Sequence, residues 1–147
     1  MSTLQITPAR ELLERMRELV GSADSTLFTC SLTKRPVPVQ PLSVSYVETD
    51  GSIWFFTQGK LLVRTEDPHR AQLFYANTRD MVYLSVSGKG QVIPDREVVR
   101  QIMDKTGTIT SKGIDQVLIC VVPTSAFYWN ARSGVVTPIL RDRPYTN

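Results

Sequence analysis

The residues best suited to chemistry lie directly after an apolar, aromatic-rich run at residues 52–57. The hydroxyl of Thr57 is followed by the permissive backbone of Gly59 and by the cations Lys60 and Arg64. Hydroxyl, backbone N–H and cationic groups together favour the binding of an anionic group such as a phosphate. The alternative interpretation is a core strand that ends in an ordinary solvated turn, because short motifs of this kind also match by chance.

Histidine and cysteine chemistry is a poor fit to this chain. The single histidine, His69, follows Asp67-Pro68 in a predicted turn and has no nucleophile or metal ligand near it in sequence. Cys30 and Cys120 lie in separate apolar runs without a CxxC spacing, which predicts buried, reduced thiols. The pattern therefore disfavours Ser/His/Asp or Cys/His hydrolysis, a zinc site and a disulfide framework.

Length and composition limit the classes of protein to which the chain can belong. A chain of 147 residues with 41% hydrophobic residues can bury one core, so we expect a single domain over residues 1–147. No apolar run approaches the roughly 20 residues that cross a bilayer, and no signal peptide is evident, which predicts a soluble cytoplasmic protein without a membrane partner. The net charge of +3 is not gathered into a run, so a nucleic-acid partner is not expected.

The apolar spacing predicts two helices and about six or seven strands. Capping residues and a helical stripe place the helices at residues 8–20, after Thr7, and 96–105, after Asp95. Pro123 is expected to end a strand because proline has no N–H for the ladder. Many short strands with few helices indicate an antiparallel barrel with helical covers. The expected strands and extended segments cover residues 26–32, 37–47, 52–57, 71–76, 81–92, 117–122 and 126–136.

Prolines and glycines mark two special places in this barrel. Pro36, Pro38 and Pro41 alternate with other residues, so their segment should lie at a sheet edge or contain a bulge. Gly88 and Gly90 lie two residues apart near the end of a long strand, which is typical of a sharp bend or a bulge in a barrel strand. No helix-opening GxGxxG context follows them, so they do not indicate a dinucleotide site.

Several local sequences, taken in their order along the chain, carry a family resemblance. They are the helix at 11–20, the strand at 26–32, Pro41-Leu42, the run 53–57, the Asp67-Pro68 turn, and residues 83–88, 94–96 and 127–130. In this order the chain resembles the FMN-binding split-barrel superfamily, and within it the pyridoxamine-phosphate-oxidase-like group of general stress protein 26. The resemblance covers nearly the whole chain.

The resemblance implies a mainly β (α+β) fold: a six-stranded antiparallel split β-barrel with helical covers, which forms a homodimer with FMN at two sites between the subunits. Hydroxyls and cations after the strand bind the flavin phosphate in such proteins, residues around Pro41 line the isoalloxazine, and an aromatic residue approaches from the partner chain. The implied cofactor-binding residues are Gln40, Pro41, Leu42, Phe56, Thr57, Lys60, Arg64 and Trp129.

The function that follows is an FMN-dependent oxidoreductase of unknown substrate. FMN carries the electrons, so no catalytic protein residue is implied; Tyr83, Tyr128 and Arg132 are either wall groups of the site or packing residues. Gln40 stands where the group usually has an arginine, and the loop after Thr57 is shorter than in the group. These departures favour an alternative, a non-catalytic split-barrel binding module with weakened or lost flavin binding. A deazaflavin or haem is a further option, and histidine-ligated haem would depend on His69.

Overall fold

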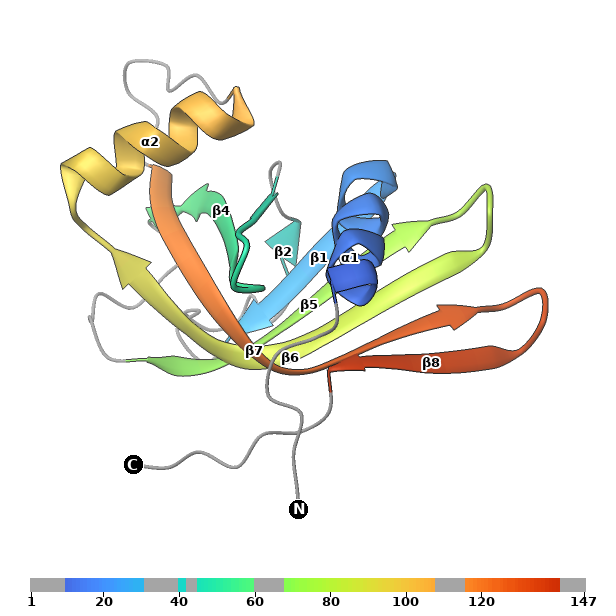
Figure 1. Ribbon diagram of the computed structural model, residues 1–147. Coiled ribbons are helices and arrows are strands. Elements are labelled where there is room, and N and C mark those ends of the chain that lie inside the picture. The colour runs from blue at the N-terminus through green and yellow to red at the C-terminus, as the bar shows by residue number, and fades with distance from the viewer. Residues whose placement is uncertain (1–9, 31–39, 42–44, 60–67, 108–115, 141–147) are drawn as a thin grey trace.

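A curled antiparallel sheet with two helices forms the described part of this computed structural model, which covers residues 10–30, 40–41, 45–59, 68–107 and 116–140 (Figure 1). The helices are α1 (Arg10–Ser22) and α2 (Arg96–Thr106). The strands are β1 (Ser25–Cys30), β2 (Gln40–Pro41), β3 (Tyr46–Val47), β4 (Ile53–Gln58), β5 (His69–Asn77), β6 (Val82–Ile93), β7 (Gln116–Asn130) and β8 (Val135–Leu140).

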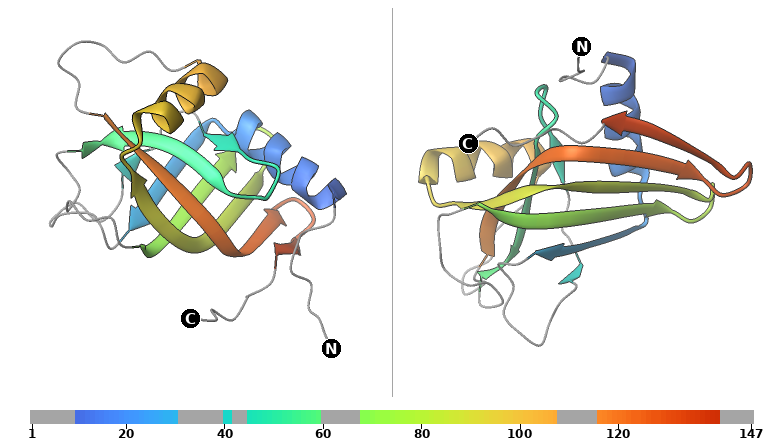
Figure 2. Two further views of the ribbon diagram at one scale, coloured as in Figure 1. Left: turned by 60° about the vertical axis from the view of Figure 1, so that its left-hand side comes forward. Right: turned by 90° about the horizontal axis from the view of Figure 1, so that it is seen from below.

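The strands follow the order β2-β1-β5-β6-β7-β4-β3, and β8 adds to β7 beside this path. All strand pairs in this sheet are antiparallel. Six strands have six or more residues, and β2 and β3 have two residues each. The predicted six-stranded split barrel with helical covers is therefore confirmed. Figure 2 shows that β6 and β7 run the length of the sheet, with α2 at one end and the β7–β8 hairpin at the other.

The main core lies on the concave side of the sheet, where α1 packs (Figure 1). Alternate residues of each strand point into it because successive side chains of a strand face opposite sides. On β1 and β4, the rings of Phe28 and Phe55 meet with their centroids 5.1 Å apart. Helix α1 contributes a buried stripe of the predicted periodicity, made of Leu13, Met16, Leu19 and Val20.

Helix α2 begins and ends where the sequence predicts. The Asp95 carboxylate accepts hydrogen bonds from the backbone N–H groups of Glu97 (2.9 Å) and Val98 (3.4 Å), which caps the first turn. Gly107 ends the helix in the left-handed conformation, with φ 69°. On its buried face Ile102 packs against a second, smaller core, and full burial of such a side chain stabilises a fold by roughly 1.5–3 kcal/mol.

Two predictions near strand ends are wrong. Pro123 does not end a strand, because β7 continues through it to Asn130. Its partner is Gly88, at a register shift between Ser87 and Gly88, and a bulge of this kind tolerates a residue without an N–H. His69 lies in β5 rather than in a turn, because the pairing of β5 with β6 extends as far as Gly90.

Other predictions from the sequence are confirmed or lie outside the described residues. The bulge predicted from the glycine pair is present. Cys30 and Cys120 are both buried thiols. The Thr7 cap lies outside the described residues.

Candidate functional site

Near the end of the predicted phosphate-binding strand, β4, Phe56 and Thr57 face opposite sides of the sheet. Phe56 lies beneath α2 in contact with the second core, and only 2% of its surface is exposed. Thr57 alternates with it and shares the face of Phe55, toward the barrel interior, with 6% exposed. Lys60 and Arg64, the predicted cations, lie outside the described residues. Near its end β4 thus presents two buried side chains, one of them carrying a hydroxyl, before the exposed Gln58.

The predicted isoalloxazine wall begins at the edge strand β2. Gln40 and Pro41 pair with Phe28 and Leu27 of β1, so the described part of the proline-rich segment lies at a sheet edge, as predicted. Leu42 lies outside the described residues.

The predicted aromatic contact, Trp129, lies near the end of β7 and is 49% exposed. It is directly opposite Tyr83 of β6, and the two ring centroids are 5.6 Å apart with planes tilted by 43°. Tilted aromatic pairs at this distance are mutually stabilising. The register of β6 and β7 therefore holds a large aromatic surface facing solvent.

Trp129 and Thr57 are far apart within one chain. Thr57 pairs with Val117 at the start of β7, whereas Trp129 lies next to the last residue of the same strand. The twelve positions between Val117 and Trp129 (129 − 117) correspond to about 40 Å of strand contour. The structure thus does not bring these two predicted site residues together in a single chain.

Trp129 belongs to a larger apolar surface on the outer side of the sheet. Pairing places Leu27, Phe74, Ser85 and Phe127 in one row across four strands, and Ala76, Tyr83, Trp129 and Val136 in the next row. A cavity of about 400 Å³ lies over these rows. We call this surface the aromatic face; its exposed apolar members are Leu27, Phe74, Phe127, Trp129 and Val136.

Most residues of the aromatic face are not predicted from the sequence. The signal that could have found it is the pair of adjacent apolar residues Leu73-Phe74, since a strand that is apolar on both faces is typical of a sheet covered on both sides. Leu73 is buried in the core, and Phe74 is exposed on the outer side.

The three possible wall groups fall in different places. Tyr83 lines the cavity of the aromatic face. Tyr128 packs on α1, where the Arg15 guanidinium lies 5.1 Å from the ring centroid. The guanidinium of Arg132 donates a hydrogen bond to the carbonyl oxygen of Arg79 at 3.1 Å, which ties two turns together. Of the three, only Tyr83 is placed to contact a ligand on the aromatic face.

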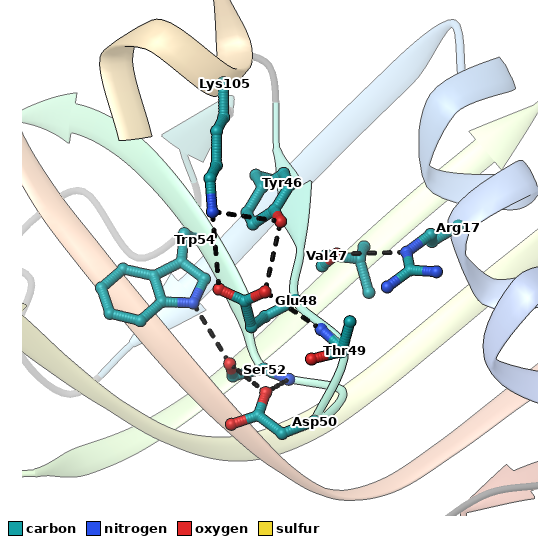
Figure 3. A network of polar contacts seen from close by, with 9 residues as sticks. All are labelled: Arg17, Tyr46, Val47, Glu48, Thr49, Asp50, Ser52, Trp54 and Lys105. Carbon is teal, nitrogen blue, oxygen red and sulfur yellow. Dashed lines mark hydrogen bonds and ion pairs between the residues drawn. The ribbon is translucent and has the colours of Figure 1, made fainter. Parts of the chain in front are cut away.

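A polar network joins α2 to the β3–β4 turn (Figure 3). The ammonium of Lys105 lies 4.8 Å from the ring centroid of Tyr46 and 4.0 Å from a carboxylate oxygen of Glu48. In the same turn the Trp54 indole N–H donates to the Ser52 hydroxyl at 3.1 Å. Cation–π and exposed ion-pair contacts each contribute up to about 1 kcal/mol, so the network fixes the position of α2 over the second core.

Burial suppresses the ionisation of Cys120 and Tyr75. Burial, reinforced by the negative charge of Asp50, raises the pKa of Cys120 to about 12. Burial also raises the pKa of Tyr75, although its hydroxyl shares a 2.9 Å hydrogen bond with Ser45. Cys120 is therefore a neutral thiol near neutral pH, and a neutral thiol is a poor nucleophile.

Metal and membrane motifs are not found in the part of the chain that the structure describes. Its His, Cys, Asp and Glu residues form no group of three or more that could hold a metal ion. Neither α1 nor α2 is long and apolar enough to cross a membrane.

Comparison with solved structures supports the fold. A NimC/NimA family protein from Clostridium acetobutylicum superposes with a TM-score of 0.62 at 12% identity, covering 88% of this chain and 92% of that one. A protein related to general stress protein 26, of the pyridoxinephosphate oxidase family, from the same organism gives 0.59 at 14% identity, covering 89% and 96%. General stress protein 26 from Bacillus anthracis str. Sterne gives 0.54 at 12% identity, covering 87% and 98%.

Comparison at the level of sequence gives the family. No curated protein matches the chain. The family described as pyridoxamine 5'-phosphate oxidase like matches residues 11–141, which is most of the 147-residue sequence. Together with the split-barrel sheet and its two helices, this match identifies the chain as a member of the pyridoxamine 5'-phosphate oxidase-like family.

Proposed function

We propose that this protein binds FMN and acts as a flavin-dependent oxidoreductase, with the flavin held between two copies of the chain. The observation that carries the proposal is the aromatic face, where the paired rings of Tyr83 and Trp129 are held open to solvent beside a cavity of about 400 Å³. Membership of the pyridoxamine 5'-phosphate oxidase-like family supports a flavin as the ligand.

A second copy is needed to complete such a site. Thr57 of β4 pairs with Val117 at the start of β7, whereas Trp129 lies near the other end of β7, so a ligand that contacts both would receive one residue from each of two chains. The aromatic face also leaves several large apolar side chains exposed on neighbouring strands, and contiguous apolar patches on a sheet mark interaction surfaces. We therefore propose a homodimer that buries the aromatic face.

The described residues fit the ring end of FMN. Large aromatic side chains suit a planar, largely apolar ring system. Bound FMN would supply electron and hydride transfer. The chain's own residues would orient the ring against Trp129 and exclude water from it, with Gln40 and Pro41 at the neighbouring edge strand.

A second candidate function is a non-redox binding module for an aromatic or phosphate-bearing small molecule. The observation that favours it is the chemistry of the cavity lining, in which tyrosines are the only ionisable groups among the described residues. The identity of residue 40 also favours the binding module, since the amide of Gln40 brings no positive charge to a flavin. Haem held by histidine has less support, because His69 lies at the start of β5 and the cavity lies over its other end.

The visible spectrum of the purified protein, followed by titration with FMN, tests the proposal. We expect a flavin absorption spectrum, or an increase in the melting temperature when FMN is added to colourless protein, because a ligand that binds only the folded state stabilises it. If FMN binds and the bound flavin is reduced by NADH or NADPH, the oxidoreductase is supported. If FMN binds without reduction by any donor tested, the binding module replaces it. If saturating FMN neither shifts the melting temperature of the protein nor loses fluorescence on mixing, then the protein is neither a flavin-dependent oxidoreductase nor a flavin-binding module.

A further inference from the structure

A second cavity, of about 510 Å³, lies over residues 70–72 of β5 and 87–89 of β6, on the outer side of the sheet and next to the aromatic face. Its chemistry differs sharply from that of the aromatic face, because its lining is mostly polar and cationic. The described residues that line it are Thr29, Cys30, Arg70, Ala71, Gln72, Ser87, Gly88, Lys89 and Thr124. None of these described residues is an aspartate or glutamate.

Two of the lining residues are cations held directly opposite each other. Arg70 of β5 pairs in register with Lys89 of β6, so both side chains leave the same face of the sheet. Like charges at directly opposed positions on neighbouring strands destabilise a sheet. An anion between the two side chains would turn this repulsion into attraction.

A row of hydrogen-bonding groups lies beside the two cations. Thr29, Gln72 and Ser87 are in register across β1, β5 and β6, two positions before Lys89 along β6. All three side chains are half-buried and leave the same face as the cations. Hydroxyl and amide groups next to an arginine and a lysine form a donor set suited to the oxygens of a phosphate.

The bulge of β7 shapes the floor of this cavity. Gly88 approaches the opposite strand so closely that a Cβ there would lie 2.2 Å from the carbonyl oxygen of Val122. The Thr124 hydroxyl donates to the carbonyl oxygen of Ser87 at 3.2 Å, where the register shifts. The backbone is thus held in a fixed, irregular shape under the cation pair.

We propose that this cavity is an oxyanion site that takes a phosphate group, with Arg70 and Lys89 supplying charge and Thr29, Gln72 and Ser87 supplying hydrogen bonds. The site is separate from Thr57, which lies on β4 and faces the barrel interior. The proposal does not rest on flavin binding. Its ligand is recognised as a phosphate, whether free or carried by a small molecule.

Inorganic phosphate is the probe that tests the site. The melting temperature is measured in phosphate and in sodium chloride of equal ionic strength, so that general screening cancels. We expect a saturable, phosphate-specific stabilisation of the unaltered protein. The double variant Arg70→Gln, Lys89→Gln should bind phosphate at least about tenfold more weakly, because each charge-assisted hydrogen bond contributes roughly 1.5–3 kcal/mol. In sodium chloride alone it should melt no lower than the unaltered protein.

A matched control removes two other positive charges. Arg96 and Arg100 are exposed on α2, and Arg96→Gln, Arg100→Gln lowers the net charge by the same amount. This variant should keep the full phosphate response. Equal responses of the two double variants, or no phosphate-specific response of the unaltered protein, would overturn the site.

Comparison of FMN with riboflavin separates this site from the flavin site. Arg70→Gln, Lys89→Gln should leave the ratio of the FMN and riboflavin affinities unchanged. A loss of the preference for FMN in this variant would show that the cavity holds the flavin phosphate, and the proposal of a separate site would be wrong.

Discussion

Tyr83 and Trp129 occupy directly opposed positions on β6 and β7, and their ring centroids lie 5.6 Å apart with planes tilted by 43°. This pairing holds the Trp129 ring against its neighbour while half of the residue remains exposed. A ring that is already ordered loses little conformational entropy when a partner or ligand covers it. The pair is therefore a preorganised contact at the centre of the aromatic face.

Phe127→Glu should weaken self-association. Phe127 is 40% exposed on the aromatic face, and a carboxylate there would have to be buried on dimerisation. We expect the dimer dissociation constant, measured by sedimentation, to rise by about 100-fold or more. Val122→Glu is the matched control, since Val122 is 51% exposed on the same strand but outside the cavity lining. Equal effects of the two changes would argue against the aromatic face as the interface, and a monomeric unaltered protein at micromolar concentration would contradict the dimer itself.

Lys60→Ala and Arg64→Ala should weaken FMN binding more than riboflavin binding. Both residues lie outside the described part of the chain, and the prediction rests on their position in sequence after Thr57. Removing a cation that binds a phosphate costs about 1.5–3 kcal/mol, or roughly 10- to 150-fold in affinity. Fluorescence titration with both flavins measures the difference, and riboflavin is the internal control. Parallel losses for both flavins would mean that neither cation contacts the phosphate.

Gly88→Ala should destabilise the fold far more than Gly90→Ala. At Gly88 the new methyl group would meet backbone, 2.2 Å from the carbonyl oxygen of Val122, whereas at Gly90 it would meet the Ala71 side chain at 3.2 Å. We expect the free energy of unfolding to fall by about 3 kcal/mol for Gly88→Ala and by about 1 kcal/mol for Gly90→Ala. Urea denaturation measures both changes. Equal, small losses would show that the bulge relaxes without strain.

Stability should fall as the pH rises above about 9, and Cys120 should account for part of the fall. Its pKa is raised from 9.0 to about 12 in the folded state, so the unfolded thiol ionises first. The stabilisation from the neutral thiol is thus fully present below pH 9 and is lost as the pH rises toward 12. Cys120→Ala should reduce the slope of unfolding free energy against pH by about 1.4 kcal/mol per unit in this window.

Urea denaturation at several pH values between about 8 and 11 measures that slope. Tyr75→Phe provides a second test, because burial also raises the pKa of Tyr75 and its contribution should appear about one pH unit higher, from pH 10. If Cys120→Ala leaves the slope unchanged, the thiol is not shielded as the structure indicates.

The sequence predicts the elements of this fold well because their signals are local. The helical stripe ending at Val20 and the cap at Asp95 depend on neighbours within a turn, and both are found in the structure. The continuation of β7 through Pro123 is not predictable in this way. It depends on the bulge opposite Gly88, which is set by a different strand.

The candidate site was predictable only in part, for the same reason. The sequence indicates Trp129 through a family resemblance, but the exposure of Phe74 depends on what covers the outer side of the sheet. The opposition of Arg70 and Lys89 follows from the register of β5 and β6, which the intervening turn sets. Contacts fixed by register cannot be read from the spacing of residues along one strand.

The long strand β7 also decides when the protein can fold. It pairs with β4, β6 and β8, and its pairing with β4 joins Gln58 to Gln116, which are 58 positions apart (116 − 58) in the sequence. Contacts between residues so distant in sequence slow folding, because the loop between them must close before they form. During synthesis on the ribosome, β4 therefore cannot pair with β7 until β5, β6 and α2 have been made. Until the last third of the chain has been made, the apolar edge of β4 is open to chaperones or to other nascent chains.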